Sequence, residues 1–280
     1  DVRSDTDLAV FQDAPLCEEL ASYRLLIVAA ADVLERAGTD ALPASFRERC
    51  ALYDVDGLGL HFGDAALENP LAKALFGRLA AGAMHFDHVS SLHLSTSQLG
   101  VEAMTALAKL LTADTCCLKR LDVSFTRIDA RALVEALKTN ESLTALDVRK
   151  VPKMAAEYGV LGELLLAPGS KCRLGYLRCD AFELLEGEAS LSLREAPIDK
   201  GAAQLLTGLL KTNNRTLREL DLAATGFEID WATALITALP ASGASLTALH
   251  LPYNPTSDPE SQAVLHALVK EHDLKVALHF

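Results

Sequence analysis

Basic residues are scarce in this sequence relative to acidic ones. Lysine and arginine total 26 against 38 aspartate and glutamate residues, which leaves a formal net charge of −12 over 280 residues. Nucleic acids and anionic membrane surfaces attract cationic proteins, so this balance disfavours both as partners. It is compatible with a basic protein partner. Acidity that only keeps a protein soluble gives the same composition, so the charge alone does not identify a partner.

Long apolar runs and paired-cysteine motifs are also missing. The longest strongly apolar run, Leu25–Leu34, is interrupted by Asp32 and is too short to cross a bilayer, so we expect no membrane insertion. Six cysteines are present, but none forms a C-x-x-C motif, and Cys116 and Cys117 are adjacent. This pattern favours free thiols in a reducing compartment and therefore predicts a cytoplasmic protein.

No complete catalytic or cofactor-binding motif occurs. The sequence contains no G-x-S-x-G and no glycine-rich phosphate loop, and the glycines of Gly57–Gly59 alone do not indicate a nucleotide site. The segment His85–His88 (HFDH) holds two histidines and an aspartate but lacks the further partners that complete a metal site. It is more typical of a turn between a helix and a strand. We therefore expect no enzyme activity, no metal and no cofactor.

A repeated motif is the most informative feature that the sequence does contain. Ser142–Val148 (SLTALDV) returns as Ser245–Leu251 (SLTALHL), with variants at Leu118–Val123 (LKRLDV) and Leu217–Leu222 (LRELDL). All four fit L-x-x-L-x-L, which is typical of a short strand whose leucines point to one side. Successive strand leucines are 29, 25, 31, 14, 29 and 29 residues apart, and they are Leu92, Leu121, Leu146, Leu177, Leu191, Leu220 and Leu249. This period is the length of one strand plus one helix and predicts a solenoid.

Segments rich in alanine and leucine follow the strands and predict helices. The expected helices are Ala65–Ala83, Gly100–Leu111, Asp129–Lys138, Asp199–Lys211, Asp230–Leu239 and Pro259–Lys270. Asp129, Asp199 and Asp230 stand at the start of a helix, where an aspartate caps free backbone N–H groups. A closing strand is expected at Leu274–Leu278.

The first fifty residues do not follow the period. Residues 1–50 are expected to form an N-terminal helical cap, with one helix at Pro15–Arg36, because the end of a solenoid exposes leucines that must be covered. A helix that binds a partner is the alternative. The repeat domain is expected over residues 51–280.

The middle of the repeat domain is expected to be irregular, over residues 151–188. Val151–Lys171 is long and contains two prolines and three glycines, and only 14 residues separate the strand leucines on either side of Ala181–Glu188. We expect a connection without a helix at Ala181–Glu188. We interpret the whole segment as a functional insertion, because long irregular connections in regular folds often carry binding. Drift of a single repeat is the alternative.

The strand motif, the long period and the helix in every repeat resemble leucine-rich repeats of the ribonuclease-inhibitor type, roughly from Leu52 to Phe280. In that family the loop position after the strand usually holds asparagine or cysteine. Here it is Ser97, Thr126, Thr225 and Asn254, whereas Val151 and Ala196 depart from the pattern.

The resemblance implies an α/β solenoid, a curved horseshoe with parallel strands on the concave face and helices on the convex face. It also implies a non-enzymatic scaffold that binds a protein partner. We expect a subunit of a larger assembly, such as a cytoskeletal one. One branch of the family activates a small GTPase, and that activity is the alternative function.

The residue between the two leucines of each strand should form a column on the sheet face. The column contains His93, Asp122, Asp147, Arg178, Ser192, Asp221 and His250. Neighbouring strands lie about 4.8 Å apart, so Asp122 and Asp147 are expected side by side. Repulsion should then raise the pKa of one of them unless a cation is near. This mixed-charge face is either a docking surface for a protein or a set of ion pairs between strands, and the sequence leaves both open.

Ten residues are the candidates for binding a partner. They are Arg120, Asp122, Phe125, Asp147, Arg149, Lys150, Arg178, Arg194, Asp221 and Tyr253. We expect Arg149, Lys150 and Arg178 to converge on the centre of the face. Phe125 and Tyr253 come just after their strands, where exposed aromatic side chains are typical binding anchors. Packing of either ring under the adjoining loop is the alternative.

Overall fold

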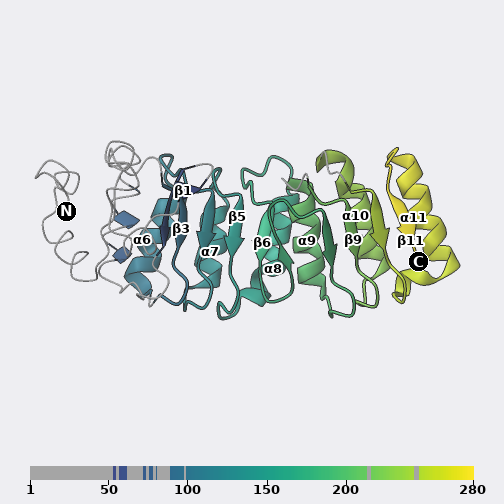
Figure 1. The fold of residues 1–280 in the computed structure, drawn as a ribbon, viewed down its shortest axis with the longest axis horizontal. Helices are drawn as coiled ribbons and strands as arrows, with labels where there is room; N and C mark the ends of the chain where they lie inside the picture. Colours follow the sequence, from purple (N-terminus) through teal and green to yellow (C-terminus); the bar gives the residue numbers. More distant parts are fainter. Residues whose placement is uncertain are drawn as a thin grey trace, which may run out of the picture. The chain divides into compact units, whose positions relative to one another are not determined.

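The structure is a computed structural model, and it describes residues 53–54, 57–61, 72–73, 76–77, 80, 89–97, 99–212, 216–242 and 246–280. The expected N-terminal helix and His85–His88 lie outside the described residues. The described chain is a mixed α/β protein in which strands alternate with helices (Figure 1). It divides into an N-terminal unit, Asp1–Leu143 with Arg149–Pro152, and a C-terminal unit, Thr144–Val148 with Lys153–Phe280.

The N-terminal unit contains strands that pair mostly in parallel. Its elements are β1 (Tyr53–Asp54), β2 (Gly57–His61), β3 (Val89–His93), α6 (Val101–Thr112), β4 (Arg120–Asp122) and α7 (Ala130–Leu137). β1 and β2 form an antiparallel pair, whereas β2, β3 and β4 pair in parallel. Helices α6 and α7 pack against each other.

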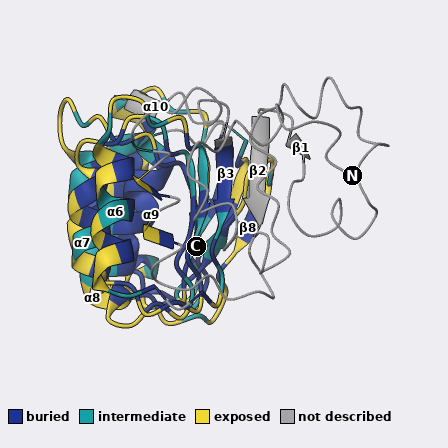
Figure 2. Ribbon diagram, turned by 90° about the vertical axis from the view of Figure 1, so that its left-hand side faces the viewer, coloured by how far each residue is buried: buried dark blue, intermediate teal, exposed yellow. Residues whose placement is uncertain are grey.

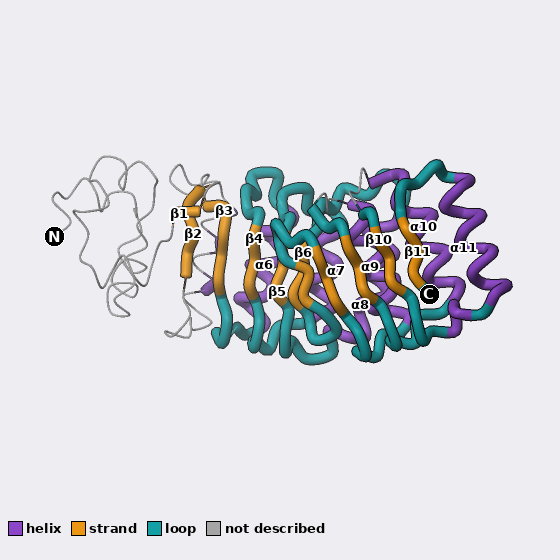
Figure 3. Tube along the Cα trace, turned by 45° about the vertical axis from the view of Figure 1, so that its right-hand side comes forward, coloured by secondary structure: helices purple, strands orange, loops and turns teal. Residues whose placement is uncertain are grey.

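The C-terminal unit continues the alternation. Its elements are β5 (Ala145–Asp147), α8 (Met154–Leu166), β6 (Tyr176–Arg178), β7 (Glu183–Leu184), β8 (Ser190–Ser192), α9 (Lys200–Thr212), β9 (Glu219–Asp221), α10 (Ile229–Ser242), β10 (Ala248–His250), the 3-10 helix η2 (Pro255–Ser257), α11 (Pro259–Glu271) and β11 (Ala277–His279). β5 pairs in parallel with β6, and β8, β9, β10 and β11 form a parallel sheet. Figure 3 shows β10 and β11 side by side at the C-terminal end of the row of strands.

The strand leucines form the core, as predicted. All seven are at most 7% exposed. Leu92 pairs with Leu121, Leu146 with Leu177, and Leu220 with both Leu191 and Leu249, in each case between parallel strands. Burying a side chain of this size stabilises the fold by about 1.5–3 kcal/mol. In both units the buried sides of the helices are turned toward the strands (Figure 2).

The predicted parallel pairing of Leu177 with Leu191 is wrong. Leu177 pairs instead with Leu184 of β7, and this pair is antiparallel. Fourteen residues are too few for a strand, a helix and two turns, so the chain forms the β6–β7 hairpin. The helix-free connection expected at Ala181–Glu188 is confirmed. The expected pairing of Leu121 with Leu146 would join the two units and stays a prediction.

Aspartate caps begin three of the predicted helices. Asp129 accepts hydrogen bonds from the backbone N–H groups of Arg131 and Ala132, and Asp258 caps α11 in the same way. Asp199 accepts one from Ala202 at the start of α9. Each such cap contributes about 1 kcal/mol. Asp230 is not a cap, because α10 already begins at Ile229, so Asp230 lies in its first turn.

The expected irregularity of Val151–Lys171 is not observed, because α8 occupies Met154–Leu166. Glycines that suggested breaks in the sequence are contact residues between α8 and α9. A Cβ atom on Gly162 would lie 2.6 Å from the backbone carbon of Gln204, and one on Gly208 would lie 2.7 Å from Cβ of Leu165. The two helices therefore approach closely even though the β6–β7 hairpin comes between them in the chain.

Candidate functional site

The sheet face of the C-terminal unit carries polar side chains in register. Ser192, Asp221, His250 and His279 occupy one row across β8, β9, β10 and β11. Nε of Arg194 lies 3.2 Å from Oδ2 of Asp221, so the predicted column is occupied here by paired charges. Each strand contributes one residue to the row because side chains alternate between the two faces of a sheet.

A histidine pair lies at the end of this row. The rings of His250 and His279 are stacked with their centroids 4.4 Å apart and their planes within 10°. Nε2 of His250 also lies 3.1 Å from Oε1 of Glu219, which is more than half exposed. This pair includes one residue, His279, that sequence reasoning did not select. The closing strand was expected at Leu274–Leu278, one residue short of it.

Arg178 bridges two carboxylates at the start of the C-terminal unit. Its Nη1 atom lies 3.4 Å from Oδ2 of Asp147, and its Nε donates a hydrogen bond of 3.0 Å to Oε2 of Glu183. Asp147 is only 6% exposed. A buried carboxylate requires a charged partner, so Arg178 has a structural role toward Asp147. Of the two, Arg178 is the more accessible to a partner.

Asp122 lies in a hydrogen-bonded environment in the N-terminal unit. Burial opposes its ionisation, but the neighbouring His93 and Ser124 outweigh that effect and lower its pKa. The backbone N–H of Ser124 donates a 2.9 Å hydrogen bond to Oδ1 of Asp122. The carboxyl that was expected to repel a neighbour is therefore stabilised as an anion. Asp122 and Asp147 belong to different units, so their proximity stays a prediction.

Ser91, His93 and Asp122 form a chain of contacts that sequence reasoning missed. Oγ of Ser91 lies 2.8 Å from Nε2 of His93, and Nδ1 of His93 lies 3.8 Å from Oδ2 of Asp122. The order of the groups is that of a nucleophile, a base and an orienting carboxylate. Ser91 is only 2% exposed, however, which closes its hydroxyl to a substrate. These three residues therefore form a polar network within the sheet face. The sequence signal for this network was the alternation of residues on β3, which places Ser91 and His93 on the same side of the strand.

The remaining basic candidates lie on the N-terminal unit. Arg120 and Arg149 are half-exposed, and Lys150 is exposed. Arg149 and Lys150 belong to this unit whereas Arg178 belongs to the other, so their predicted convergence stays a prediction.

Among the described loops, each parallel strand from β3 to β10 except β6 is followed by a non-glycine residue with a positive φ angle, in the left-handed region. Each lies four residues after the strand leucine, and they are Thr96, Phe125, Lys150, Glu195, Ala224 and Tyr253. Non-glycine residues rarely adopt positive φ, so its recurrence at one position of the repeat indicates a constrained turn. Backbone hydrogen bonds tie these turns together: Glu195 N–H donates to Ala223 and Ala224 N–H donates to Pro252.

Asn254 holds the last of these turns from within. Its Nδ2 atom donates to the carbonyl oxygens of Leu222 and Leu251, and its Oδ1 accepts from the N–H groups of Thr225 and Phe227. The side chain is buried and spans two successive loops. The loop position that was compared with the leucine-rich repeat pattern thus satisfies backbone groups that would otherwise be buried without partners.

The two candidate aromatic residues of the turns are exposed. Phe125 is 55% exposed and Tyr253 is 81% exposed, so neither ring is packed under its loop. The residue that follows each of them, Thr126 or Asn254, is buried and bonded to the strand end. The backbone therefore fixes where each ring projects.

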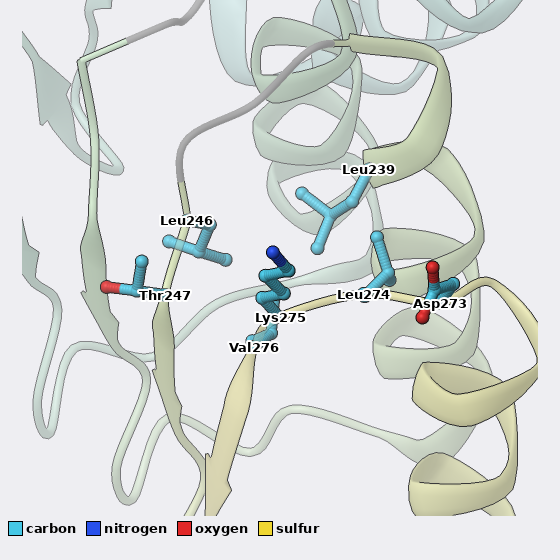
Figure 4. Close-up of a pocket in the computed structure, with 7 residues that line it drawn as sticks. All are labelled: Leu239, Leu246, Thr247, Asp273, Leu274, Lys275 and Val276. Atoms are coloured by element: carbon cyan, nitrogen blue, oxygen red, sulfur yellow. The ribbon is translucent and has the colours of Figure 1, made fainter.

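A pocket of about 330 Å³ lies at the start of β10 and β11, and Figure 4 shows its lining. Leu239, Leu246, Leu274 and Val276 give it an apolar wall, and Lys275 extends between Leu239 and Leu246. Residues 243–245, which connect α10 to β10, lie outside the described part of the chain. We assign no ligand to this pocket.

The four described cysteines, Cys116, Cys117, Cys172 and Cys179, are free. Burial raises the pKa of the Cys172 and Cys179 thiols, so neither is a reactive thiolate. Among the described residues there is no group of three or more metal-ligand side chains. Within the same part of the chain, none of the helices has the length and apolar character needed to cross a bilayer.

No family model and no curated protein matches the sequence of this chain.

Proposed function

We propose that this chain is a leucine-rich-repeat solenoid of the ribonuclease-inhibitor type. Hydrogen bonds between residues 29 positions apart support a stacked repeat. They join Asn140 to Leu111, Ser124 to Ser95 and Thr247 to Arg218. The same spacing separates Thr225 from Asn254. Because each repeat covers the next, such contacts are what a solenoid requires. A horseshoe with a concave sheet is the arrangement that the resemblance implies.

The function that we propose is a non-enzymatic protein-interaction scaffold within a larger assembly. The exposed ring of Tyr253 is the observation that carries this proposal. It projects from a turn that Asn254 and two prolines constrain, so little conformational entropy is lost when a partner covers it. Aromatic side chains held in this way are typical anchors of protein interfaces.

The charges on the adjoining sheet face support the same function. Arg194 and Glu219 are about half exposed, and they pair with Asp221 and His250, respectively. Exposed pairs of this kind contribute little to stability, about 0.2–1 kcal/mol each. Across an interface they contribute mainly to specificity and to the rate of association. A partner that contacts Tyr253 would meet this mixed-charge row beside it.

The free cysteines support a reducing compartment, and we propose a cytoplasmic location. Regulation of a small GTPase is the alternative function that the resemblance implies. Such a regulator needs a dedicated residue on a loop, and no contact among the described loops singles one out. We therefore favour binding without catalysis.

Replacement of Tyr253 tests the scaffold function. Tagged wild-type chain and the Tyr253→Ala variant are expressed in the source cells, and co-purifying proteins are quantified by mass spectrometry. Removing the ring should deplete the partner at least tenfold, because an interface anchor contributes about 2 kcal/mol or more.

Val160→Ala is the matched control for this experiment. Val160 is an exposed apolar residue on α8, away from the loops and the sheet face. This variant should recover the partner at the wild-type level. Equal recovery by the Tyr253→Ala variant would refute the proposal that Tyr253 anchors a partner.

A further inference from the structure

Three turns of the N-terminal unit bring an aromatic ring next to basic side chains. The backbone N–H of Phe125 donates a 2.8 Å hydrogen bond to the carbonyl oxygen of Arg149, so the turn after β4 lies against the turn that contains Arg149 and Lys150. The N–H of Thr96 donates to the carbonyl oxygen of Ser124 at 3.1 Å, which attaches the turn after β3 in the same way. The three turns therefore form a continuous row.

The backbone of these turns presents their side chains in a fixed direction. Thr96, Phe125 and Lys150 have φ angles of 64°, 57° and 59°. Few conformations are open to a non-glycine residue with a positive φ, so each turn is constrained before any partner binds. Phe125 is 55% exposed, and Arg127 and Lys150 are exposed beside it. A partner that covers these side chains therefore loses little affinity to ordering of the turns.

The charge of this surface is opposite in sign to that of the chain. We call Phe125, Arg127, Arg149 and Lys150 the basic turn surface. In the described parts of the three turns, the carboxylate that faces these cations in the sequence is that of Asp129, and it caps the start of α7. A local excess of positive charge thus lies on a chain whose net charge is −12.

Helix stability does not explain these cations. The N-terminus of a helix carries the positive end of its dipole and favours acidic residues in the first turn. Three other helices have a glutamate there, and these residues are Glu102, Glu157 and Glu260. The first turn of α7 has no acidic residue and instead holds Arg131, with Arg127 just before the helix. Both cations oppose the dipole, so a role in binding an anion accounts for them better than a role in the fold.

The chemistry of the basic turn surface fits a short acidic segment of a protein. Guanidinium groups such as those of Arg127 and Arg149 bind carboxylates through paired hydrogen bonds, and the ring of Phe125 can bury an apolar side chain. Neighbouring strands lie about 4.8 Å apart, so a row of three turns spans about 10 Å, the length of about three extended residues. A long polyanion such as RNA would also meet repulsion from the rest of this acidic chain, whereas a short segment contacts only the local surface.

We propose that the basic turn surface binds an acidic segment of a partner protein. An apolar side chain of the segment packs on Phe125, and its carboxylates bind Arg127, Arg149 and Lys150. This surface belongs to the N-terminal unit, whereas Tyr253 belongs to the C-terminal unit. It is therefore a second interaction surface, and it does not depend on the anchor role of Tyr253.

Fluorescence anisotropy with a labelled acidic peptide tests this proposal. The probe is a short peptide in which a central leucine is flanked on both sides by glutamate and aspartate residues. The full chain should bind the probe saturably, and binding should weaken as salt is added. Phe125→Ala, Arg127→Glu and Lys150→Glu should each raise the Kd about tenfold or more, the effect typical of an anchor residue at an interface.

Two control variants should bind the probe like the wild type. Lys109→Glu makes the same charge change as Lys150→Glu at an exposed position in the last turn of α6, away from the turns. Tyr253→Ala removes the anchor of the scaffold function and leaves the basic turn surface intact, so the two proposals fail independently. With serine in place of the leucine of the probe, Phe125→Ala should bind like the wild type. Circular dichroism verifies that every variant is folded.

Three results would overturn the proposal. The first is the absence of binding between the probe and the wild-type chain at low salt. The second is equal weakening by Lys109→Glu and Lys150→Glu, because it would show an effect of net charge alone. The third is equally tight binding of a single-stranded RNA oligonucleotide through the same residues, which would indicate a general polyanion site instead of one for an acidic protein segment.

Discussion

At the scale of single residues, the polar side chains act mainly on the backbone and on each other. Asn254 satisfies backbone groups of two loops. Asp122 accepts a hydrogen bond from the backbone N–H of Ser124, and its Oδ2 atom lies 3.8 Å from Nδ1 of His93. Asp147 is buried against Arg178. These roles explain why a charged column on a sheet face does not by itself identify a binding site. Some of its members are required by the fold, and only the exposed ones are available to a partner.

The lowered pKa of Asp122 predicts a pH dependence of stability. A carboxyl whose pKa is lower in the folded state than in the unfolded state stabilises the fold above the unfolded pKa, and this contribution is lost as the pH falls through the folded pKa. The Asp122→Asn variant should therefore lose less stability than the wild type on acidification below about pH 4. Urea unfolding at several pH values measures the difference.

Asp258→Asn provides the matched control for Asp122, because the pKa of Asp258 is also lowered but this residue is exposed and caps α11. Its contribution to the acid dependence should be smaller, because its carboxyl is exposed and solvent screens its charge. Identical acid profiles of the Asp122→Asn variant and the wild type would contradict the role assigned to His93 and Ser124.

At the scale of elements, the close approach of α8 and α9 compensates for a missing helix. The β6–β7 hairpin adds strands between β5 and β8 without adding a helix. Gly162 and Gly208 allow α8 and α9 to lie against each other at this point. Glycine is therefore required here by the distance between two helices, not by the conformation of a turn.

Replacing Gly162 with alanine should destabilise the protein. The new methyl group would lie 2.6 Å from the backbone of Gln204, and backbone cannot rotate away as a side chain can. We expect a loss of about 1–3 kcal/mol, typical of overpacking, in the free energy of unfolding measured by urea denaturation. The control is Ala155→Gly, at an exposed position of the same helix. It reverses the helix-propensity change of Gly162→Ala without any change in packing, and it should lower the free energy of unfolding by about 1 kcal/mol. A Gly162→Ala variant as stable as the wild type would contradict the close helix contact.

At the scale of the whole molecule, a 29-residue interval recurs both in several hydrogen bonds and in the spacing of the buried leucines Leu191, Leu220 and Leu249. Leu220 has a strand leucine on each side, Leu191 on β8 and Leu249 on β10, and all three are buried. A leucine in this row therefore contributes to the core on both sides of its strand. The stability of the C-terminal unit depends on the continuity of this row.

Leu220→Ala should lower the free energy of unfolding by about 2–5 kcal/mol, because the cavity adds to the lost burial. Thermal or urea unfolding measures this change. The matched control, Leu185→Ala, removes the same atoms from an exposed position of the β6–β7 region and should change stability by less than about 0.5 kcal/mol. Comparable losses for both variants would contradict the core role of Leu220.

The sequence by itself determined the features that depend on neighbouring residues. The L-x-x-L-x-L motif located the parallel strands and their buried leucines. Aspartates at Asp129 and Asp199 located helix starts, and the short interval before Leu191 predicted a connection without a helix. These features follow from side-chain alternation, from capping and from chain length, which are local properties.

Only the tertiary structure decided the features that depend on residues far apart in the chain. The antiparallel pairing of Leu177 with Leu184 replaced the expected parallel one, and glycines that suggested a break in Val151–Lys171 became a helix contact. Packing in the folded protein also buries Asp147 and leaves Tyr253 exposed, although both were selected from the sequence as binding residues. The physical reason is that burial, hydrogen bonding and charge pairing are set by packing between distant segments, which the periodicity of the sequence does not record.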